Sequence, residues 1–106
     1  MNRFHFSLTM LMVPAFTCIA HAAAAADLTK GRQMFQQGTT PACAVCHTLK
    51  DAGTSGEIGP NLDELKPDAD RVAKAIREGL GVMPAFTDLS DEEVRLLAEY
   101  VAAATK

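Results

Sequence analysis

Apolar residues recur at helical spacing in three segments of the chain, and no segment shows the strict alternation of a half-buried strand. The clearest segment lies near the C-terminus, where Ser90 and Glu93 form the serine-x-x-glutamate pattern of a capping box. The residues after it place an apolar face at i, i+3, i+4, i+7 and i+8: Val94, Leu97, Ala98, Val101 and Ala102. The spacing predicts a C-terminal helix that begins at the capping box.

A second helix is predicted over residues 27–37. Asp27 is its expected N-cap and Gly38 its expected stop. Its apolar residues are Leu28, Met34 and Phe35. A short break at Pro41 follows, and we expect a further helical turn after that proline.

A third helix is predicted to begin at Asp68 or Asp70 and to end at Gly79. Its apolar residues are Val72, Ala73 and Ile76. Residues 51–65 and 79–86 contain too much glycine and proline for a continuous helix or strand, so we expect loops there. Three or four short helices joined by glycine-rich loops predict an all-α domain.

The first 22 residues have the pattern of a cleavable secretory signal. Arg3 supplies the positive start, residues 8–20 supply an apolar stretch, and Ala22 completes a small-x-small cleavage pattern. A membrane anchor is the alternative, but a spanning helix needs about 20 apolar residues and Pro14 interrupts this shorter stretch. Cleavage would remove residues 1–22.

Residues 23–106 are then expected to form one exported domain in the periplasm, without stable membrane insertion, although the following alanines leave the cut open up to Ala26. The chain has 13 acidic and 10 basic residues and a formal net charge of −3. It contains no basic stripe, which argues against a nucleic-acid partner.

The residues that carry chemistry are Cys43, Cys46 and His47. The pattern Cys-x-x-Cys-His is the attachment signature of a c-type haem. On a helix, positions i, i+3 and i+4 share one face, so two thiols can each form a thioether to the porphyrin while the imidazole points at the iron. Beyond residue 22 these are the chain's two cysteines and its one histidine.

Two other readings of the cysteine pair are weaker. A structural zinc site usually takes four cysteine or histidine ligands, and residues 23–106 offer three. A thioredoxin-like dithiol would lie in a βαβ pattern, which the sequence lacks. One covalently bound haem c is therefore the expected cofactor, with His47 as the proximal ligand of its iron.

The sixth iron ligand is predicted to be Met83, in a loop 36 residues after His47 that can fold over the opposite face of the haem. Met34 is the competitor, but its position in a predicted helix suits packing. The second ring nitrogen of the histidine needs an acceptor, and the Pro60 carbonyl can supply one. Spacing alone is equally consistent with Pro60 as a simple loop stop.

These residues and their order resemble the class I c-type cytochromes over residues 23–106. In that family a glycine and an aromatic residue of the N-terminal helix cross the C-terminal helix. Gly31 and Phe35 match the first helix, and Leu97 and Tyr100 look like the second. The resemblance implies the cytochrome c fold, in which three to four short helices wrap around one covalently attached haem.

The resemblance also implies roles for loop residues. The run that contains Pro60 and Leu62 is similar to the family loop whose proline carbonyl receives the histidine N–H and whose leucine packs on the haem. The residues around Met83 look like the methionine-ligand loop. The chain contains no tryptophan, which many members use at a haem propionate, so the groups that hold the propionates here are left open.

An iron held by His47 and Met83 has no free position for a substrate, so we expect an electron carrier and not an enzyme. Single electrons would pass from a periplasmic dehydrogenase to a cytochrome or oxidase, and the free protein would be a monomer. Residues 43–65 resemble the small cytochromes that accept electrons from periplasmic sulfite dehydrogenases. The expected docking rim of apolar side chains is Ala42, Ala44, Val45, Ala85 and Phe86. Two alternatives are a haem subunit held permanently in a dehydrogenase and, without Met83 as ligand, an open-site haem enzyme or sensor.

Overall fold

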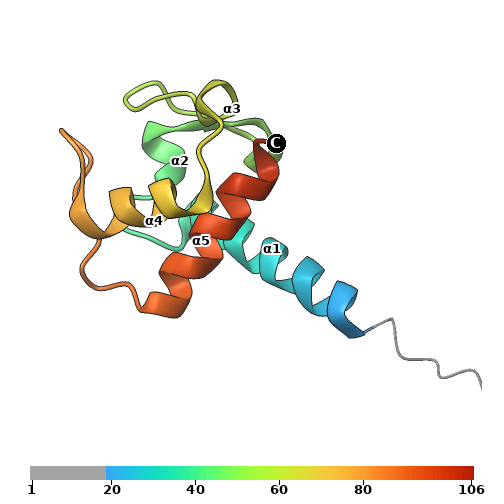
Figure 1. Cartoon of the computed structure of the whole chain (residues 1–106). Helices are drawn as coiled ribbons and strands as arrows, with labels where there is room; N and C mark the ends of the chain where they lie inside the picture. Colours follow the sequence, from blue (N-terminus) through green and yellow to red (C-terminus); the bar gives the residue numbers. More distant parts are fainter. Residues whose placement is uncertain (1–18) are drawn as a thin grey trace, which may run out of the picture.

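The computed structural model describes residues 19–106, with side-chain surroundings from Asp27 onward (Figure 1). Its helices are α1 (Ile19–Gln37), α2 (Cys43–Cys46), α3 (Leu62–Leu65), α4 (Ala69–Glu78) and α5 (Asp91–Ala104). Between α2 and α3 lie the strands β1 (Thr48–Leu49) and β2 (Thr54–Ser55), which pair antiparallel, and the 3-10 turn η1 (Lys50–Ala52). The predicted all-α class is confirmed. The predicted signal, residues 1–22, lies outside the described residues except for 19–22.

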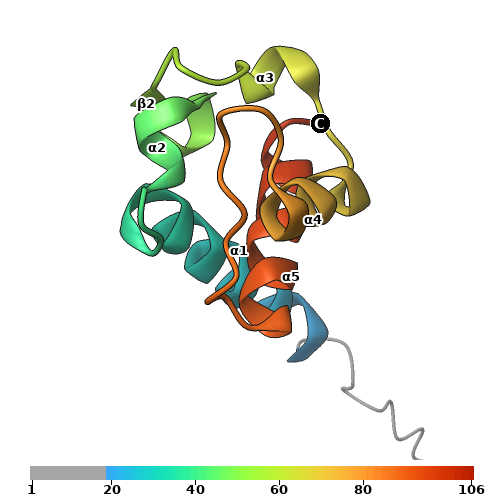
Figure 2. The same ribbon diagram turned by 90° about the vertical axis from the view of Figure 1, so that its left-hand side faces the viewer.

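Three longer helices make the frame of the molecule. Helix α5 packs against both α1 and α4, which lie on different sides of it (Figure 1). The turned view shows the segment between α4 and α5 rising between α2 and α4 (Figure 2). Within residues 19–106, no helix is both long enough and apolar enough to cross a membrane.

Gly31 lies at the point where α1 and α5 cross. A Cβ atom at this position would lie 2.5 Å from the Cβ of Tyr100 and 2.7 Å from the carbonyl oxygen of Leu96. Only a residue without a side chain allows the two backbones to approach so closely. Phe35 then packs edge-on against Tyr100, with ring centroids 6.2 Å apart and an interplanar angle of 66°. The contact expected for Gly31, Phe35 and Tyr100 is present.

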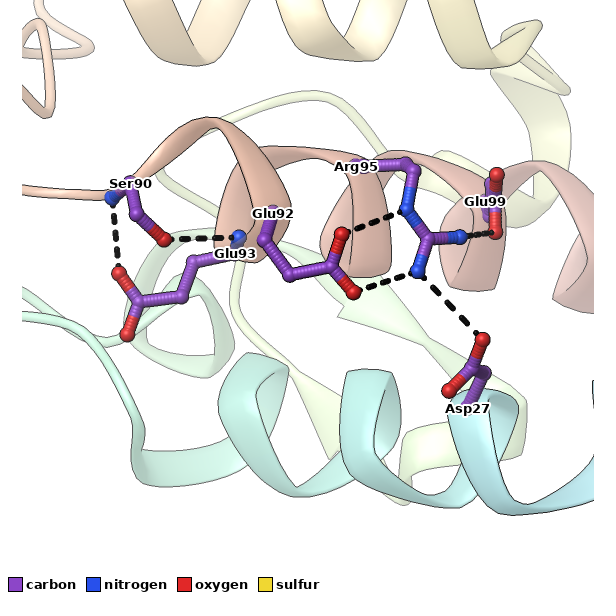
Figure 3. Close-up of polar contacts among 6 residues, drawn as sticks. All are labelled: Asp27, Ser90, Glu92, Glu93, Arg95 and Glu99. Carbon is purple, nitrogen blue, oxygen red and sulfur yellow. Dashed lines mark hydrogen bonds and ion pairs between the residues drawn. The ribbon is translucent and has the colours of Figure 1, made fainter. Parts of the chain in front are cut away.

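Helix α1 begins earlier than the sequence pattern predicted. Asp27 is not its N-cap but lies inside the helix, because the alanines at 22–26 have the highest intrinsic helix propensity and extend it upstream. The Asp27 carboxylate instead accepts from the Arg95 guanidinium of α5 at 3.4 Å (Figure 3). Arg95 also binds Glu92 and Glu99 at 2.6 Å each, so one arginine links two turns of α5 to α1.

The predicted starts of α4 and α5 are confirmed. The Ser90 hydroxyl accepts from the Glu93 backbone N–H at 3.2 Å, and the Glu93 carboxylate accepts from the Ser90 N–H at 2.8 Å (Figure 3). This is the reciprocal capping box. At α4 the Asp68 carboxylate accepts from the Arg71 N–H at 2.8 Å, and the helix ends at Glu78, just before Gly79.

Residues 51–65 are not a plain loop as predicted. Leu62–Leu65 form one helical turn, which is initiated because the Asn61 side chain accepts from the Asp63 N–H at 3.0 Å. Strand β2 pairs with β1 in the register Thr48 to Ser55 and Leu49 to Thr54. Elements this short make no periodic pattern, which explains why the sequence did not indicate them.

The hydrophobic core fills the space where α1, α4 and α5 meet the β1–η1 segment. Its members share fractional exposures below 10%: Phe35, Leu49, Ala52, Leu62, Ile76, Phe86, Val94, Leu97, Tyr100 and Val101. Leu96, on the α1 side of the crossing, is buried as well, although the apolar spacing of the C-terminal helix did not include it. The core is continuous from the helix crossing to the short elements.

A polar cluster closes the edge of this core. The Tyr100 hydroxyl donates to the Asp51 carboxylate at 2.6 Å, and the Arg32 guanidinium donates to the same carboxylate at 2.8 Å. The tyrosine hydroxyl first and the arginine second lower the pKa of Asp51. Burial first and the Asp51 bond second raise the pKa of Tyr100 to about 12. Three segments, α1, η1 and α5, are thereby joined.

Substitution of Gly31 with alanine is expected to destabilise the protein by about 1–3 kcal/mol, because the new methyl group forces α1 and α5 apart. Denaturant unfolding followed by circular dichroism measures the change. Gln33→Ala, on the exposed side of the same helix, is the control and should change stability by less than about 0.5 kcal/mol. If Gly31→Ala were stabilising, as helix propensity alone predicts, the close crossing would be wrong.

Tyr100→Phe keeps the ring and removes the hydroxyl bond to Asp51, at an expected cost of about 1 kcal/mol at pH 7. The pKa of Asp51 is lowered in the folded state, so its stabilising contribution is present above the unfolded carboxyl pKa of about 4. The advantage of the native chain over the variant should therefore shrink as the pH falls through the lowered pKa. Urea midpoints between pH 7 and pH 3 measure it, and a difference that grows toward acid pH would contradict it.

Candidate cofactor site

An apolar cavity of about 320 Å³ opens between α2, α4 and the loop that joins α4 to α5. The lining side chains come from four separate segments of the chain. They include Cys43, Cys46, His47, Ile58, Pro60, Leu65, Val72, Met83, Pro84 and Phe86. The structure therefore gathers both cysteines, the histidine, the proline and the methionine of the sequence prediction around one hollow.

The two cysteines lie one turn apart on α2 and are not joined in a disulfide. Both are partly buried. Burial raises the pKa of the Cys43 thiol, and the Thr39 hydroxyl, 3.6 Å from its sulfur, partly opposes that rise. At neutral pH the thiol is therefore protonated in the folded chain.

His47 ends α2, and its backbone N–H donates to the Cys43 carbonyl at 3.0 Å. Its ring atom Nδ1 lies 2.8 Å from the carbonyl oxygen of Pro60. A carbonyl oxygen only accepts hydrogen bonds, so this contact requires the tautomer with the proton on Nδ1. In the neutral ring with this tautomer, the lone pair is on the other nitrogen, Nε2.

Gly59 makes room for this ring. A Cβ atom there would lie 2.6 Å from the His47 ring, so a side chain would push the imidazole away. The Gly59 N–H donates to the Cys46 carbonyl at 2.7 Å and keeps the loop against α2. On the other side, the Thr54 hydroxyl donates to the His47 carbonyl at 2.9 Å. The sequence pattern did not single out Thr54, because a Thr-Ser pair in a glycine-rich stretch has no distinctive signature.

Met83 lies in a tight turn of the loop after α4. The backbones of Leu80 and Met83 exchange two hydrogen bonds of 3.0 Å, and the Phe86 N–H donates to the Ile76 carbonyl of α4 at 2.8 Å. These bonds hold the turn against α4 while the partly buried Met83 side chain lines the cavity. Met34, the competing methionine, packs against the core from α1 and is not part of the lining.

Two residues of the sequence prediction lie elsewhere than expected. Phe86 is not part of an exposed rim, since its exposed fraction is 9% and it belongs to the core. Its backbone N–H donates to the Ile76 carbonyl of α4, and its side chain also lines the cavity. Leu62 is also buried in the core and does not line the cavity, whereas Leu65, one helical turn later, does. Of the predicted rim, Val45 and Ala85 are exposed.

The chemistry of these donors fits a covalently attached haem. Two free thiols, one imidazole with a fixed tautomer and one thioether border an apolar hollow. Within residues 19–106, no three histidine, cysteine or carboxylate side chains are grouped to hold a metal ion, so a closed zinc site has no ligand set there. The βαβ surroundings of a redox dithiol are also missing from these residues, whose strands have two residues each.

Comparison with known proteins gives the same answer. Residues 26–101 match the family described as cytochrome C oxidase, cbb3-type, subunit III. The crystal structure of the c-type cytochrome SorU from Sinorhizobium meliloti is similar to this chain, with a TM-score of 0.74 and 51% sequence identity. The similarity covers 76% of this chain and 93% of SorU.

Two relatives are similar in sequence. Cytochrome c-551 of Halorhodospira halochloris is 33% identical over 78 residues, which are 67% of this chain and 92% of that protein. Cytochrome c6 of Cyanidioschyzon merolae is 33% identical over 107 residues, which cover 93% of each chain. With the family match over most of its length and these relatives beside it, the chain belongs to the small class I c-type cytochromes, which bind haem c covalently and transfer electrons.

Proposed function

We propose that this cytochrome carries single electrons from a periplasmic dehydrogenase to a downstream cytochrome or oxidase, with His47 and Met83 as the axial ligands of its haem iron. One observation carries the proposal: both side chains line the same apolar cavity, beside Cys43 and Cys46. The haem c, when bound, supplies a one-electron couple between ferric and ferrous iron.

The residues of α2 would hold the cofactor. Cys43 and Cys46 are the thiols for the two thioether bonds, and their one-turn separation presents both to one edge of the ring. The bond from Nδ1 of His47 to the Pro60 carbonyl orients the imidazole and raises the basicity of Nε2 toward the iron. Pro60 thus acts through the histidine.

Met83 would affect both the reduction potential of the haem iron and the access of other molecules to it. A thioether opposite an imidazole favours the reduced iron and raises the potential relative to two imidazoles. As a ligand, Met83 would also leave no position for a substrate, which suits electron transfer and disfavours an open-site enzyme or sensor. The turn that carries it is anchored to α4 by backbone bonds, so the sulfur is held on a fixed support.

The proposed compartment and donor rest on sequence resemblance. The pattern of residues 1–22 supports export to the periplasm. The resemblance of residues 43–65 to acceptors of periplasmic sulfite dehydrogenases supports such an enzyme as the donor. The 51% identity to SorU, a c-type cytochrome, supports the role of an electron-transfer protein.

The proposed docking surface is an apolar rim of Ala44, Val45, Ile58 and Ala85. Val45 and Ile58 have exposed fractions of 57% and 66%, which is high for apolar side chains of this size. Ile58 also lines the cavity, so the rim reaches its edge. A small apolar surface suits the short encounters of electron-transfer partners.

Met83→Leu tests the ligand assignment, because leucine keeps the volume and removes the sulfur. We expect a high-spin spectrum, binding of carbon monoxide by the reduced protein, and at least a tenfold less favourable reduction, which is about 59 mV for one electron. Absorption spectra and redox titration measure these changes. Met34→Leu is the matched control and should keep the native spectrum.

Two outcomes would refute the proposal. A native spectrum in Met83→Leu would show that Met83 is not an iron ligand. A purified protein without a pyridine haemochrome spectrum would show that no haem is bound.

A charge in the rim should slow electron transfer. We expect Ala85→Lys and Ala85→Glu each to lower the second-order rate with a sulfite dehydrogenase about 3- to 10-fold, because both place a charge where apolar surface must be desolvated. Stopped-flow mixing of reduced donor with oxidised cytochrome measures the rate. Ala103→Lys, exposed on α5 and outside the cavity lining, is the control. Native rates in both Ala85 variants would place docking elsewhere.

A further inference from the structure

One charged side chain, Arg71 of α4, borders the apolar cavity. Apart from Cys43, Cys46, His47 and the Met83 thioether, the other lining side chains are aliphatic, aromatic, proline or glycine. Arg71 follows Asp68, the N-cap of α4, by three residues, and its backbone N–H is bound by that carboxylate. The side chain is exposed, so it lies where the cavity meets solvent.

The Arg71 guanidinium also differs from the other arginines of residues 19–106. Arg32, Arg77 and Arg95 each donate to a carboxylate, at 2.8, 3.3 and 2.6 Å respectively. The side chain of Arg71 makes no hydrogen bond or ion pair with the described part of the chain. Asp68, the acid three residues before it, is engaged by the backbone instead. Five donors are thus available at the cavity edge.

The missing partner of this guanidinium has a defined chemistry. A carboxylate that enters an apolar hollow loses hydration, and the loss is offset when a guanidinium forms two charge-assisted hydrogen bonds with it. A haem carries two propionate carboxylates on one edge. The chain has no tryptophan that could donate to them.

We propose that Arg71 binds a haem propionate and thereby orients the haem and raises its reduction potential. The proposal rests on the proposed function, since it requires a haem in this cavity. An unpaired propionate places a negative charge near the iron and favours the ferric state, and the guanidinium offsets that charge. Arg71 is therefore a positioning residue that acts on the iron through the propionate.

The reduction potential and the NMR signals of the arginine side chains test this role in the full haem-loaded protein. Arg71→Gln removes the charge and should make reduction about 3- to 10-fold less favourable, where tenfold is about 59 mV for one electron. Arg71→Lys keeps the charge and should restore at least half of that change. Arg77→Gln on the same helix, whose native partner is the exposed Asp91, is the matched control and should keep the native potential.

A second measurement needs no variant. With nitrogen-15 arginine, the Nε–H resonance of Arg71 should shift between the oxidised and reduced protein and exchange more slowly with water than that of Arg77. Equal potentials in Arg71→Gln and Arg77→Gln, or an Arg71 resonance unaffected by oxidation state, would overturn the inference while the haem spectrum stays native. A protein without haem would instead overturn the proposed function.

Discussion

The close crossing of α1 and α5 at Gly31 is the contact on which the rest of this structure depends. It allows Phe35 to pack edge-on against Tyr100 at the crossing. Helix α4 packs on the far side of α5, and the short elements from β1 to α3 close the core through Leu49 and Leu62. A domain of this size has little apolar area to bury, so a single well-packed crossing contributes a large share of its stability.

The cavity is built from the parts of the chain that the crossing leaves free. Helix α2 follows α1 after a short break, and the Met83 turn follows α4, so both site segments hang from helices that the core holds. Backbone bonds from Gly59 to Cys46 and from Phe86 to Ile76 then fix each segment locally. Because these segments are already fixed, little conformational entropy is lost when their side chains bind a cofactor.

The chain shares its fold and its family with the cytochromes c that it matches. Its site combines the Cys-x-x-Cys-His turn with a histidine bond to the Pro60 carbonyl. The cluster of Arg32, Asp51 and Tyr100, and the arginine at the cavity edge, are charged features of this chain. The cluster joins α1, η1 and α5 at the edge of the core, and the arginine is available to a carboxylate at the cavity.

Sequence by itself determined whatever depends on neighbours a few residues apart. The capping box at Ser90, the N-cap at Asp68 and the attachment turn at Cys43 are local patterns whose physical basis lies in backbone hydrogen bonds and helix geometry, and each is found where it was predicted. The family followed from the order of those patterns. Two local predictions were wrong. At Asp27 the helix propensity of the alanines outweighed a capping preference, and at Asn61 a one-turn helix forms where a loop was expected.

Only the tertiary structure decided what depends on distant segments meeting. Phe86 is buried in the core beside α4, and Leu65 of the α3 turn, not Leu62, is part of the cavity lining. Arg71 gave no sequence signal, since its significance lies in an apolar lining drawn from four segments. Such relations are set by the packing of whole elements, and periodicity along the chain carries no information about them.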